Sequence, residues 1–367
     1  MASVFGIETE YGIHAPAAPE VPPSVLSAAV VAAYPGVATG GALDWVEPIP
    51  IEDAHNRILA NGARLYVDHA HPEYSGPEVT TAADAVAYDL AGDAAVVAGA
   101  RLASAQLGFE IAIYKNNTDS KGASYGCHEN HLLPRSVPWS RIAAVLPSFL
   151  VSRTVLIGAG RVGLGRNGER PGFQLSQRAD FFETLVGLQT TKRRPLLNTR
   201  DEPHAPPARY RRLHVITGDA NRHPFTTWLK VGTLAGVLAA LIDDELPAVA
   251  LADPVAAFGE VSHDPSLKRT LDTSVGRLTA IDLQERLLHA VLAHAERHPD
   301  AHDPSVLAAW GEVLDDLRTD PTSCADRLEW VGRLELIRAY AERHGLAWGD
   351  ARLAALDLAW ARLDAPG

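Results

Sequence analysis

Residues 64–78 constrain the fold more than any other stretch, because they combine a strand pattern with two prolines and three acidic residues. Apolar residues alternate with Tyr66 and Asp68, which are therefore expected on one face of a strand. The prolines keep the residues that follow out of a helix and predict an extended, irregular path. Asp68, Glu73 and Glu78 would then repel one another unless a cation lies among them. A divalent metal carrying a nucleotide phosphate is such a cation.

The composition is typical of a soluble globular protein. The chain has 367 residues, of which 47% are hydrophobic, and this length allows a large core. There is no run of about 18 apolar residues, so we expect no membrane span. Two cysteines, Cys127 and Cys324, cannot form a disulfide framework, which favours a reducing cytoplasm. The net charge of −12 argues against nucleic acid as a partner.

The element patterns divide the chain into a mixed α/β body at 1–245 and a mostly helical part at 246–367. The clearest helix is 81–107, where Thr81 begins a capping-box-like pattern and Gly108 follows as a stop signal. We expect one strand at 3–13, a second that ends at residue 68, and further strands at 109–114, 128–133, 153–158, 173–178 and 213–217. We expect further helices at 25–34, 138–150, 226–242, 281–298, 305–317 and 324–344.

Two further segments carry groups suited to a metal or a phosphate. Glu8 and Glu10 lie at alternate positions of the first expected strand, so both carboxylates point the same way. They can hold hard cations, although a solvated strand face is the ordinary alternative. Residues 115–130 form a polar loop with glycines whose backbone N–H groups can approach phosphate, without the spacing of a Walker loop. His128 and Asn130 could ligand a metal or a phosphate, whereas a single histidine is more often structural.

Basic residues concentrate in one region of this acidic chain. The cluster comprises Arg178, Lys192, Arg193, Arg194, Arg200, Arg209, Arg211 and Arg212. Arginine binds carboxylate or phosphate through two N–H groups at once, so the cluster predicts an anion site, with solvated salt bridges as the alternative. His69 and His71 are expected on one strand face, and together with His204 and His214 they admit a zinc site. Neither cysteine pairs nor a His-Glu-x-x-His helix support that interpretation.

Several motifs together resemble one family, that of the Pup ligases (PafA) and Pup deamidases/depupylases (Dop). They follow the order found in that family. The matching segments are 6–12 (GIETEYG), 61–73 (NGARLYVDHAHPE), 115–119 (KNNTD), 124–130 (SYGCHEN), 176–180 (SQRAD), 198–204 (NTRDEPH), 211–214 (RRLH) and 229–233 (LKVGT). The form VDHAHPEYS and the segment VGLQTT at 186–191 resemble the depupylase more than the ligase.

The resemblance implies an α+β fold related to glutamine synthetase and the carboxylate–amine ligases. In that fold a curved antiparallel sheet with helices on its back holds Mg-ATP on its concave face, and a helical C-terminal part follows. The matched positions imply Asp68 as the catalytic carboxylate, Glu8, Tyr66 and Glu73 as Mg²⁺ ligands, Arg64 as an ATP-binding residue, and Arg178, Arg200 and His214 at the phosphate and substrate end. Within the same motifs, we add Glu10, Glu78 and His128 as metal ligands and Gly76 and Asn130 as nucleotide-binding residues.

Two departures accompany the resemblance. Residues 40–60 are too short to hold the long insertion that the depupylases carry just before the NGAR strand. The family also continues well past the segment that ends here at Gly367. We therefore expect a short form of the depupylase that lacks this insertion and the C-terminal tail.

The resemblance implies, first, hydrolysis of the C-terminal glutamine amide of Pup, or of the isopeptide bond between Pup and a lysine of another protein. Asp68 would either attack the carbonyl or activate a water or a phosphate. The alternative is ATP-dependent ligation of a glutamate to an amine, because both directions use the same cradle. A third alternative is a noncatalytic regulator that binds Pup. The retained carboxylates argue against it, since an inactive site has no need of repelling charges.

Overall fold

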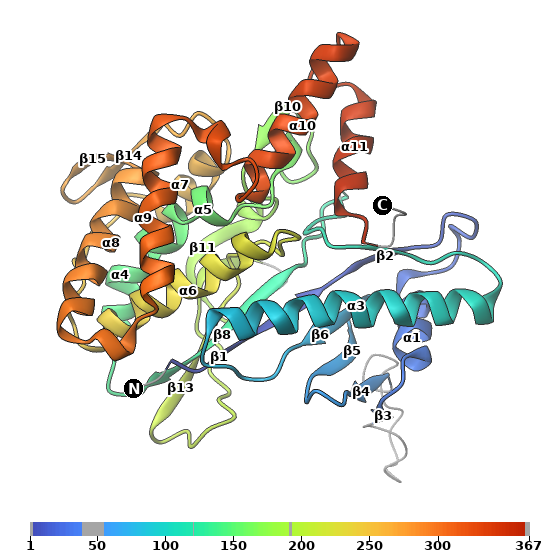
Figure 1. Ribbon diagram of the computed structural model, residues 1–367, viewed down its shortest axis with the longest axis horizontal. Helices are drawn as coiled ribbons and strands as arrows, with labels where there is room; N and C mark the ends of the chain where they lie inside the picture. The colour runs from blue at the N-terminus through green and yellow to red at the C-terminus, as the bar shows by residue number, and fades with distance from the viewer. Residues whose placement is uncertain (1–2, 39–54, 120, 191–192, 364–367) are drawn as a thin grey trace.

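The computed structural model describes residues 3–38, 55–119, 121–190 and 193–363. Within these residues a nine-stranded sheet has the order β11–β12–β13–β8–β1–β6–β5–β4–β3 (Figure 1). Its strands are β1 (Phe5–Glu10), β3 (Val37–Ala38), β4 (Asn56–Ile58), β5 (Arg64–Asp68), β6 (His71–Ser75), β8 (Cys127–Pro134), β11 (Phe182–Gly187), β12 (Arg194–Asn198) and β13 (Tyr210–Val215). Neighbouring strands are antiparallel except β11 and β12 at one edge, so the expected antiparallel sheet carries one parallel pair.

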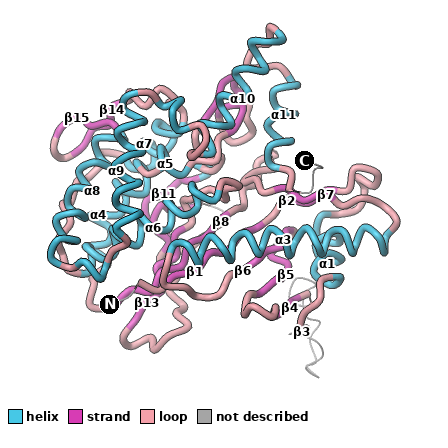
Figure 2. The backbone as a smooth tube through the Cα atoms, in the orientation of Figure 1, coloured by secondary structure: helices cyan, strands magenta, loops and turns pink. Residues whose placement is uncertain are grey.

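The long helix α3 (Ala82–Leu107) covers the back of the central strands (Figures 1 and 2). The Thr81 side chain caps its start by accepting a hydrogen bond of 3.1 Å from a backbone N–H, and Gly108 ends it in the left-handed region at φ 80°. Gly92 faces the sheet, where a Cβ atom would lie 2.5 Å from the Tyr74 ring. The small residues of α3 therefore set how closely the helix approaches β6, and the predicted helix is confirmed.

A helical group occupies the other side of the molecule (Figure 2). It contains α4 (Trp139–Ser152), α5 (Thr154–Ile157), α6 (Pro224–Ile242), α7 (Pro254–Ser262), α8 (Ala280–Arg297), α9 (Pro304–Thr319), α10 (Glu329–His344) and α11 (Ala351–Ala361). Shorter elements are α1 (Pro23–Ala33), β2 (Gly12–His14), β7 (Ala112–Tyr114), β9 (Arg161–Leu164), β10 (Arg170–Gln174), β14 (Thr270–Thr273) and β15 (Gly276–Thr279). One core cluster draws buried residues from both sides of residue 245, so the division there stays a prediction.

The structure departs from the expected elements in several places, and it contains strands β4, β9, β14 and β15 and helices α7 and α11, which were not predicted. Residues 154–157 form a helical turn rather than a strand, because a short apolar run that is buried on all sides carries no periodicity to tell the two apart. The expected irregular path after Asp68 is the regular strand β6, in which Pro72 pairs with Val67 and its carbonyl accepts a bond of 3.0 Å from the Tyr11 N–H. Strands β11 and β12 were not predicted.

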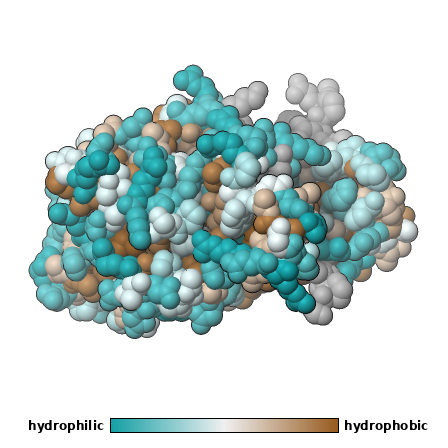
Figure 3. Space-filling view, turned by 90° about the horizontal axis from the view of Figure 1, so that it is seen from above, coloured by the Kyte–Doolittle hydropathy of each residue, from teal (hydrophilic) through white to brown (hydrophobic). Residues whose placement is uncertain are grey.

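Helix α6 is long and apolar enough to cross a membrane by length and composition, although no continuous apolar run was expected. In the structure 72% of this window is buried, which is what a core helix of a folded domain shows. Its neighbours are α3, α5, α8 and α9. The outer face of the molecule seen in Figure 3 is mostly hydrophilic, with hydrophobic side chains only in small patches. The packing therefore places α6 inside the protein core.

Candidate active site

Strand pairing gathers polar residues from distant parts of the sequence onto one face of the sheet. Residues that pair directly in an antiparallel sheet share a face and lie about 5 Å apart. Across the central strands the pairs form the rows Tyr66–Glu73–Glu10, Arg64–Ser75–Glu8–His128 and Gly6–Asn130–His214. The intervening residues, such as Ile7 and Leu65, are buried on the opposite face. The polar face is therefore the open one, as the alternation in the sequence predicted.

Four carboxylates, Glu8, Glu10, Asp68 and Glu73, make up what we call the acidic face. Glu73 is only 2% exposed and accepts a hydrogen bond from Tyr66. Burial, followed by the charges of Glu10, Glu8 and Asp68, raises the pKa of Glu73 well above its usual value. Within the described residues, no lysine or arginine forms an ion pair with any of the four. The four carboxylates therefore have no lysine or arginine ion-pair partner in the described part of the chain, although Glu8 interacts with the charges of His128 and Arg212, and Glu10 with that of Arg178.

Tyr66 and Glu10 lie in the buried part of the acidic face, where both form hydrogen bonds. Burial, reinforced by the charges of Glu73 and Glu8, raises the pKa of the Tyr66 phenol, which therefore stays protonated and donates its hydrogen bond to Glu73. Glu10 Oε2 accepts a bond of 2.6 Å from the Gly126 N–H, which fixes its position at the mouth of the loop before β8. The two residues orient the carboxylates without neutralising them.

Glu8 meets two histidines at the centre of the sheet. Donor atoms of Glu8, His128 and His214 all lie within 4.8 Å of one another. Burial opposes ionisation of Glu8, but its hydrogen bond and charge interaction with His128 outweigh this and lower its pKa to about 2. Burial, with the charge of His128, lowers the pKa of His214 to about 3. His214 Nδ1 donates to Asn130 Oδ1 at 2.8 Å, which leaves His214 Nε2 as an acceptor.

Asp68 stands at the tip of the β5–β6 hairpin. Its side chain is 39% exposed, and its Oδ2 lies 2.9 Å from Nδ1 of His69. His69 is in the left-handed region at φ 54°, a conformation that only a tight turn normally imposes on a residue with a side chain. Donor atoms of Glu10, Asp68 and His69 lie within 4.8 Å of one another. The hairpin therefore presents Asp68 beside the acidic face while leaving it open to solvent.

The same geometry separates the histidines of the zinc interpretation. His69 occupies the turn, whereas His71 begins β6 and contacts the carbonyl of Tyr11 through Nδ1 at 3.0 Å. The expectation that His69 and His71 share one strand face was wrong, because the hairpin turns between them.

A cavity of about 660 Å³ opens beside the acidic face. Predicted site residues that line it are Glu8, Arg64, Tyr66, Gly76, Glu78 and Asn130. Arg212, a member of the basic cluster, and His204, named in the zinc interpretation, also line it, but neither was assigned to the metal or nucleotide site. The signal for Arg212 was available, because it precedes His214 by two positions on one strand and so shares its face. His69, beside Asp68, was likewise missed as a neighbour of the catalytic candidate.

The basic cluster divides between two places. Arg178 is buried, and its Nη1 donates to the carbonyls of Cys127 and Gly218, each at 3.1 Å. Burial lowers the Arg178 pKa, an effect opposed first by the charge of nearby Glu10. Arg200 lies near the His214 end, half exposed, and its Nε donates to Glu202 at 2.9 Å. Arg200 thus forms a solvent-exposed salt bridge with Glu202, and its place at the phosphate and substrate end stays a prediction.

Two members of the predicted sites need separate mention. Lys192 lies outside the described residues. Arg178 does not line the cavity beside Glu8 and instead supports the neighbourhood of Glu10 from below. Its carbonyl partners could not be predicted from sequence, because they belong to segments 40 or more residues away.

Comparisons with known proteins identify the family of the chain. The family model described as "Pup-ligase protein" matches residues 3–366. The "Pup deamidase/depupylase" of Mycolicibacterium smegmatis is 46% identical over 398 residues, covering 99% of this chain and 80% of the relative. The "Pup--protein ligase" of Micrococcus luteus is 39% identical, covering 98% of this chain and 78% of the relative. The first alignment is longer than this chain, so the relative carries residues within the matched region that are absent here.

Two solved structures share the fold. A crystal structure of the complex between the prokaryotic ubiquitin-like protein Pup and its ligase PafA has a TM-score of 0.84 at 31% identity, covering 100% of this chain and 74% of that one. A structure of the ligase PafA in complex with ADP has a TM-score of 0.76 at 34% identity, covering 85% of this chain and 71% of that one. With an α+β fold, an open acidic face and a match over nearly all of its length, the chain belongs to the Pup-ligase family, and its relatives include both Pup deamidases/depupylases and Pup ligases.

Proposed function

We propose that the protein is an ATP- and Mg²⁺-dependent amide and isopeptide hydrolase that acts on the C-terminal glutamine of Pup or on Pup–lysine conjugates. The observation that carries the proposal is the convergence of Glu8, Glu10, Asp68 and Glu73 on one open face. The direction of the reaction follows the relatives, since identity is 46% to a deamidase/depupylase and 39% to a ligase. We expect it in the cytoplasm, where its two buried free cysteines, Cys127 and Cys324, stay reduced.

The acidic face fits a divalent cation. Mg²⁺ prefers oxygen donors, and Glu8, Glu10 and Glu73 supply carboxylates at adjoining positions of one sheet. The raised pKa of Glu73, caused by burial and then by the charges of Glu10 and Glu8, supports this proposal, because a cation beside Glu73 would stabilise its ionised form. We propose that Glu8, Glu10, Tyr66 and Glu73 hold Mg²⁺, with Glu78 and His128 at the edge of the site. The bound ion would neutralise phosphate oxygens of the nucleotide.

The neighbouring cavity fits a nucleotide. One solved relative is a complex with ADP. Arg64, Arg212 and Asn130 supply donors around this cavity, and Gly76 lies in its wall. Arg200 and His214 lie beyond Asn130 at the end of the same row, where a phosphate or substrate carbonyl would lie. Arg178 would contribute its positive charge from beneath Glu10.

Asp68 is the proposed catalytic carboxylate. Its side chain is 39% exposed, against 19% for that of Glu8, while Glu10 and Glu73 are buried. A substrate can therefore reach Asp68. Its contact with His69 orients the carboxylate at the hairpin tip. Asp68 then either attacks the γ-carbonyl of the substrate or takes a proton from a water that attacks it. When Asp68 attacks, the amine leaves with a proton and a water then hydrolyses the anhydride formed with Asp68, which regenerates the Asp68 carboxylate. When a water attacks, the proton taken up by Asp68 passes to the leaving amine, and both routes release a product carboxylate.

ATP-dependent ligation is the second candidate. The solved structure that covers 100% of this chain is that of a ligase with Pup, so the same fold supports the reverse reaction. There Asp68 would accept a proton from the incoming lysine amine. The two directions share every residue named above and differ in the substrate that is turned over.

A three-substrate assay separates the candidates. Purified protein with Mg-ATP is incubated with glutamine-ended Pup, with a pupylated protein, or with glutamate-ended Pup and its lysine-bearing target, and intact masses are measured. Deamidation replaces an amide nitrogen by oxygen, depupylation splits the conjugate, and ligation joins two chains with loss of water. We expect the first two. A conjugate formed only in the third mixture would establish the ligase, and binding of Pup with no mass change in any mixture would establish a regulator.

A further inference from the structure

The C-terminal ends of helices α6 and α8 meet on the helical side of the molecule, away from the strands that carry the acidic face (Figure 1). Asp243 is the C-cap residue of α6, and His298 is the C-cap residue of α8. His294 lies in the last turn of α8, one turn before His298. After a short 3₁₀ turn the chain returns with His302. Three histidines and one carboxylate are thus brought to one place.

The donor atoms of three of these residues are close enough to share an ion. Donor atoms of Asp243, His294 and His298 all lie within 4.8 Å of one another. Asp243 Oδ2 lies 3.0 Å from His294 Nε2, and the rings of His294 and His298 are stacked with centroids 4.5 Å apart. Ligand atoms around a tetrahedral Zn²⁺ are on the order of 3 Å apart, given bond lengths of about 2 Å. Small rotations of the exposed Asp243 and His298 side chains close the remaining gap.

His302 orients the central ligand from behind. Its Nε2 lies 2.6 Å from Nδ1 of His294, so the two rings share one proton. When His294 Nδ1 donates this proton, His294 Nε2 is left as a bare lone pair that faces Asp243. A hydrogen bond to the far nitrogen of a metal-binding histidine is the usual way in which proteins fix its tautomer and ring direction. His294 is completely buried, so its orientation is held by packing as well.

The surrounding charges favour a cation. Two helix C-termini direct their carbonyl ends towards this point, and each carries partial negative charge. Asp244 and Glu245 follow directly on Asp243. The nearby arginines are already engaged, since Arg297 pairs with Glu245 and Arg141 pairs with Asp244. The local balance at the three donors is therefore negative or neutral when the histidines are uncharged.

We propose that Asp243, His294 and His298 form a second metal site, specific for a zinc-class transition ion and separate from the acidic face. Two imidazole nitrogens and one carboxylate are the donor set of such ions, whereas Mg²⁺ prefers oxygen. A fourth position stays open to water because His298 and Asp243 are exposed. The bound ion clips the ends of α6 and α8 together. His302 is a positioning residue for His294 rather than a ligand.

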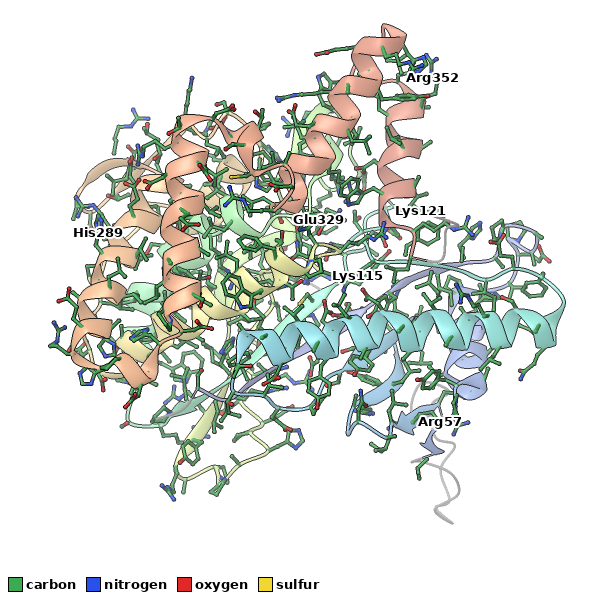
Figure 4. All side chains as sticks on the ribbon, in the orientation of Figure 1. Arg57, Lys115, Lys121, His289, Glu329 and Arg352 are labelled. Atoms are coloured by element: carbon green, nitrogen blue, oxygen red, sulfur yellow. The ribbon has the colours of Figure 1, made fainter. Side chains whose placement is uncertain are left out.

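The test uses the full-length protein freed of metal by a chelator and titrated with Zn²⁺ in the presence of excess Mg²⁺. Calorimetry gives the number of sites, and Co²⁺ in place of Zn²⁺ gives a visible absorption band that reports nitrogen ligation. Because His294 is buried, the primary variants are His298→Ala and Asp243→Asn, whose side chains are exposed. His289→Ala, an exposed histidine of the same helix outside the cluster, is the matched control (Figure 4).

We expect wild type and His289→Ala to bind one Zn²⁺ more than His298→Ala and Asp243→Asn, and to show a Co²⁺ band that the latter two lack. Zn²⁺ should raise the melting temperature of wild type but not of His298→Ala. His302→Ala should keep the site and weaken it about 10–100-fold. Equal stoichiometry and equal Co²⁺ spectra in all five proteins would overturn the proposal, as would a loss in His289→Ala equal to that in His298→Ala.

Discussion

The two faces of the central sheet treat buried charge in opposite ways. On the back face, Glu129 is 1% exposed and its carboxylate lies 2.7 Å from the guanidinium of the fully buried Arg153. On the open face, Glu73 is as deeply buried, at 2%, yet its charged neighbours are other carboxylates. Glu129 has a pKa of about 2, where the opposing cost of burial is outweighed chiefly by Arg153, whereas the pKa of Glu73 is raised.

A second network on the back face follows the same pattern. Lys115 is buried and lies between Asp89 at 2.7 Å and Asp93 at 2.9 Å, so that β1, α3 and the loop after β7 are joined (Figure 4). Tyr11 donates to Asp93 at 2.8 Å, and Thr9 donates to Asp89 at 3.0 Å. Every carboxylate there has a partner within the chain. Charges on the back face are thus paired within the chain, whereas the carboxylates of the open face are the groups for which we propose a cation as the partner.

The largest effect is expected for Asp68→Asn on the open face. Loss of a catalytic base or nucleophile should lower turnover by about 10²–10⁴-fold. Nucleotide affinity should stay within a few-fold, because Asp68 lies at the hairpin tip rather than in the cavity wall. Mass-detected turnover and equilibrium binding of a fluorescent ATP analogue measure the two quantities. Normal turnover by this variant would remove Asp68 from the catalytic role.

Lys115→Met tests the back face. It leaves Asp89 and Asp93 buried without their cation, so the free energy of unfolding should fall by about 3–5 kcal/mol. Urea denaturation followed by circular dichroism measures it. Lys121→Met, an exposed lysine of the same loop, is the matched control and should change stability by no more than about 0.5 kcal/mol. Equal effects of the two substitutions would break the comparison between the faces.

The same substitution on the two faces should have opposite signs. Glu129→Gln removes the partner of Arg153 and should cost about 3 kcal/mol of unfolding free energy. Glu73→Gln removes a charge that is opposed by Glu10 and Glu8, and without metal it should stabilise the fold on the order of 1 kcal/mol. Glu73→Gln should also weaken Mg²⁺ binding, measured by calorimetry. Destabilisation by both variants would show that the acidic face is structural after all.

The smallest expected effect is a pH dependence of the difference in unfolding free energy between Glu73→Gln and wild type. Since the folded pKa of Glu73 lies above its unfolded value of 4.5, the stability from its bound proton is present below pH 4.5 and is lost as pH rises through the folded pKa. The advantage of Glu73→Gln over wild type should therefore grow from pH 4.5 to 8 in chelator and shrink when Mg²⁺ is added. Urea denaturation at both pH values measures the difference in unfolding free energy between Glu73→Gln and wild type. A difference that changes neither with pH nor with Mg²⁺ would contradict this prediction.

Strand alternation and helix-end signals, which depend only on neighbouring residues, predicted much of the site. Alternation placed Tyr66 with Asp68 and Glu8 with Glu10 on the correct face, because side chains of a strand alternate strictly. The limits of α3 were also predictable, because Thr81 and a left-handed glycine determine them.

Other features depend on contacts that a single sequence does not reveal. The pairing of Glu10 with Glu73 is set by strand register, which the alternation within each strand does not determine. The burial of Arg178 depends on carbonyls of distant segments. All four residues of the helical turn at 154–157 are buried, so they show no alternation of apolar and polar residues that would distinguish a helix from a strand.

Strand β8 serves both faces at once. His128 and Asn130 point to the open side, while Cys127, Glu129 and His131 are buried on the other. Deleting a single residue ahead of this strand would exchange the two sets, driving an imidazole into the apolar interior and leaving Arg153 opposite the wrong side chain. An insertion or deletion in these eight residues that altered the side chains of the open face would therefore also disrupt the buried contacts of the back face.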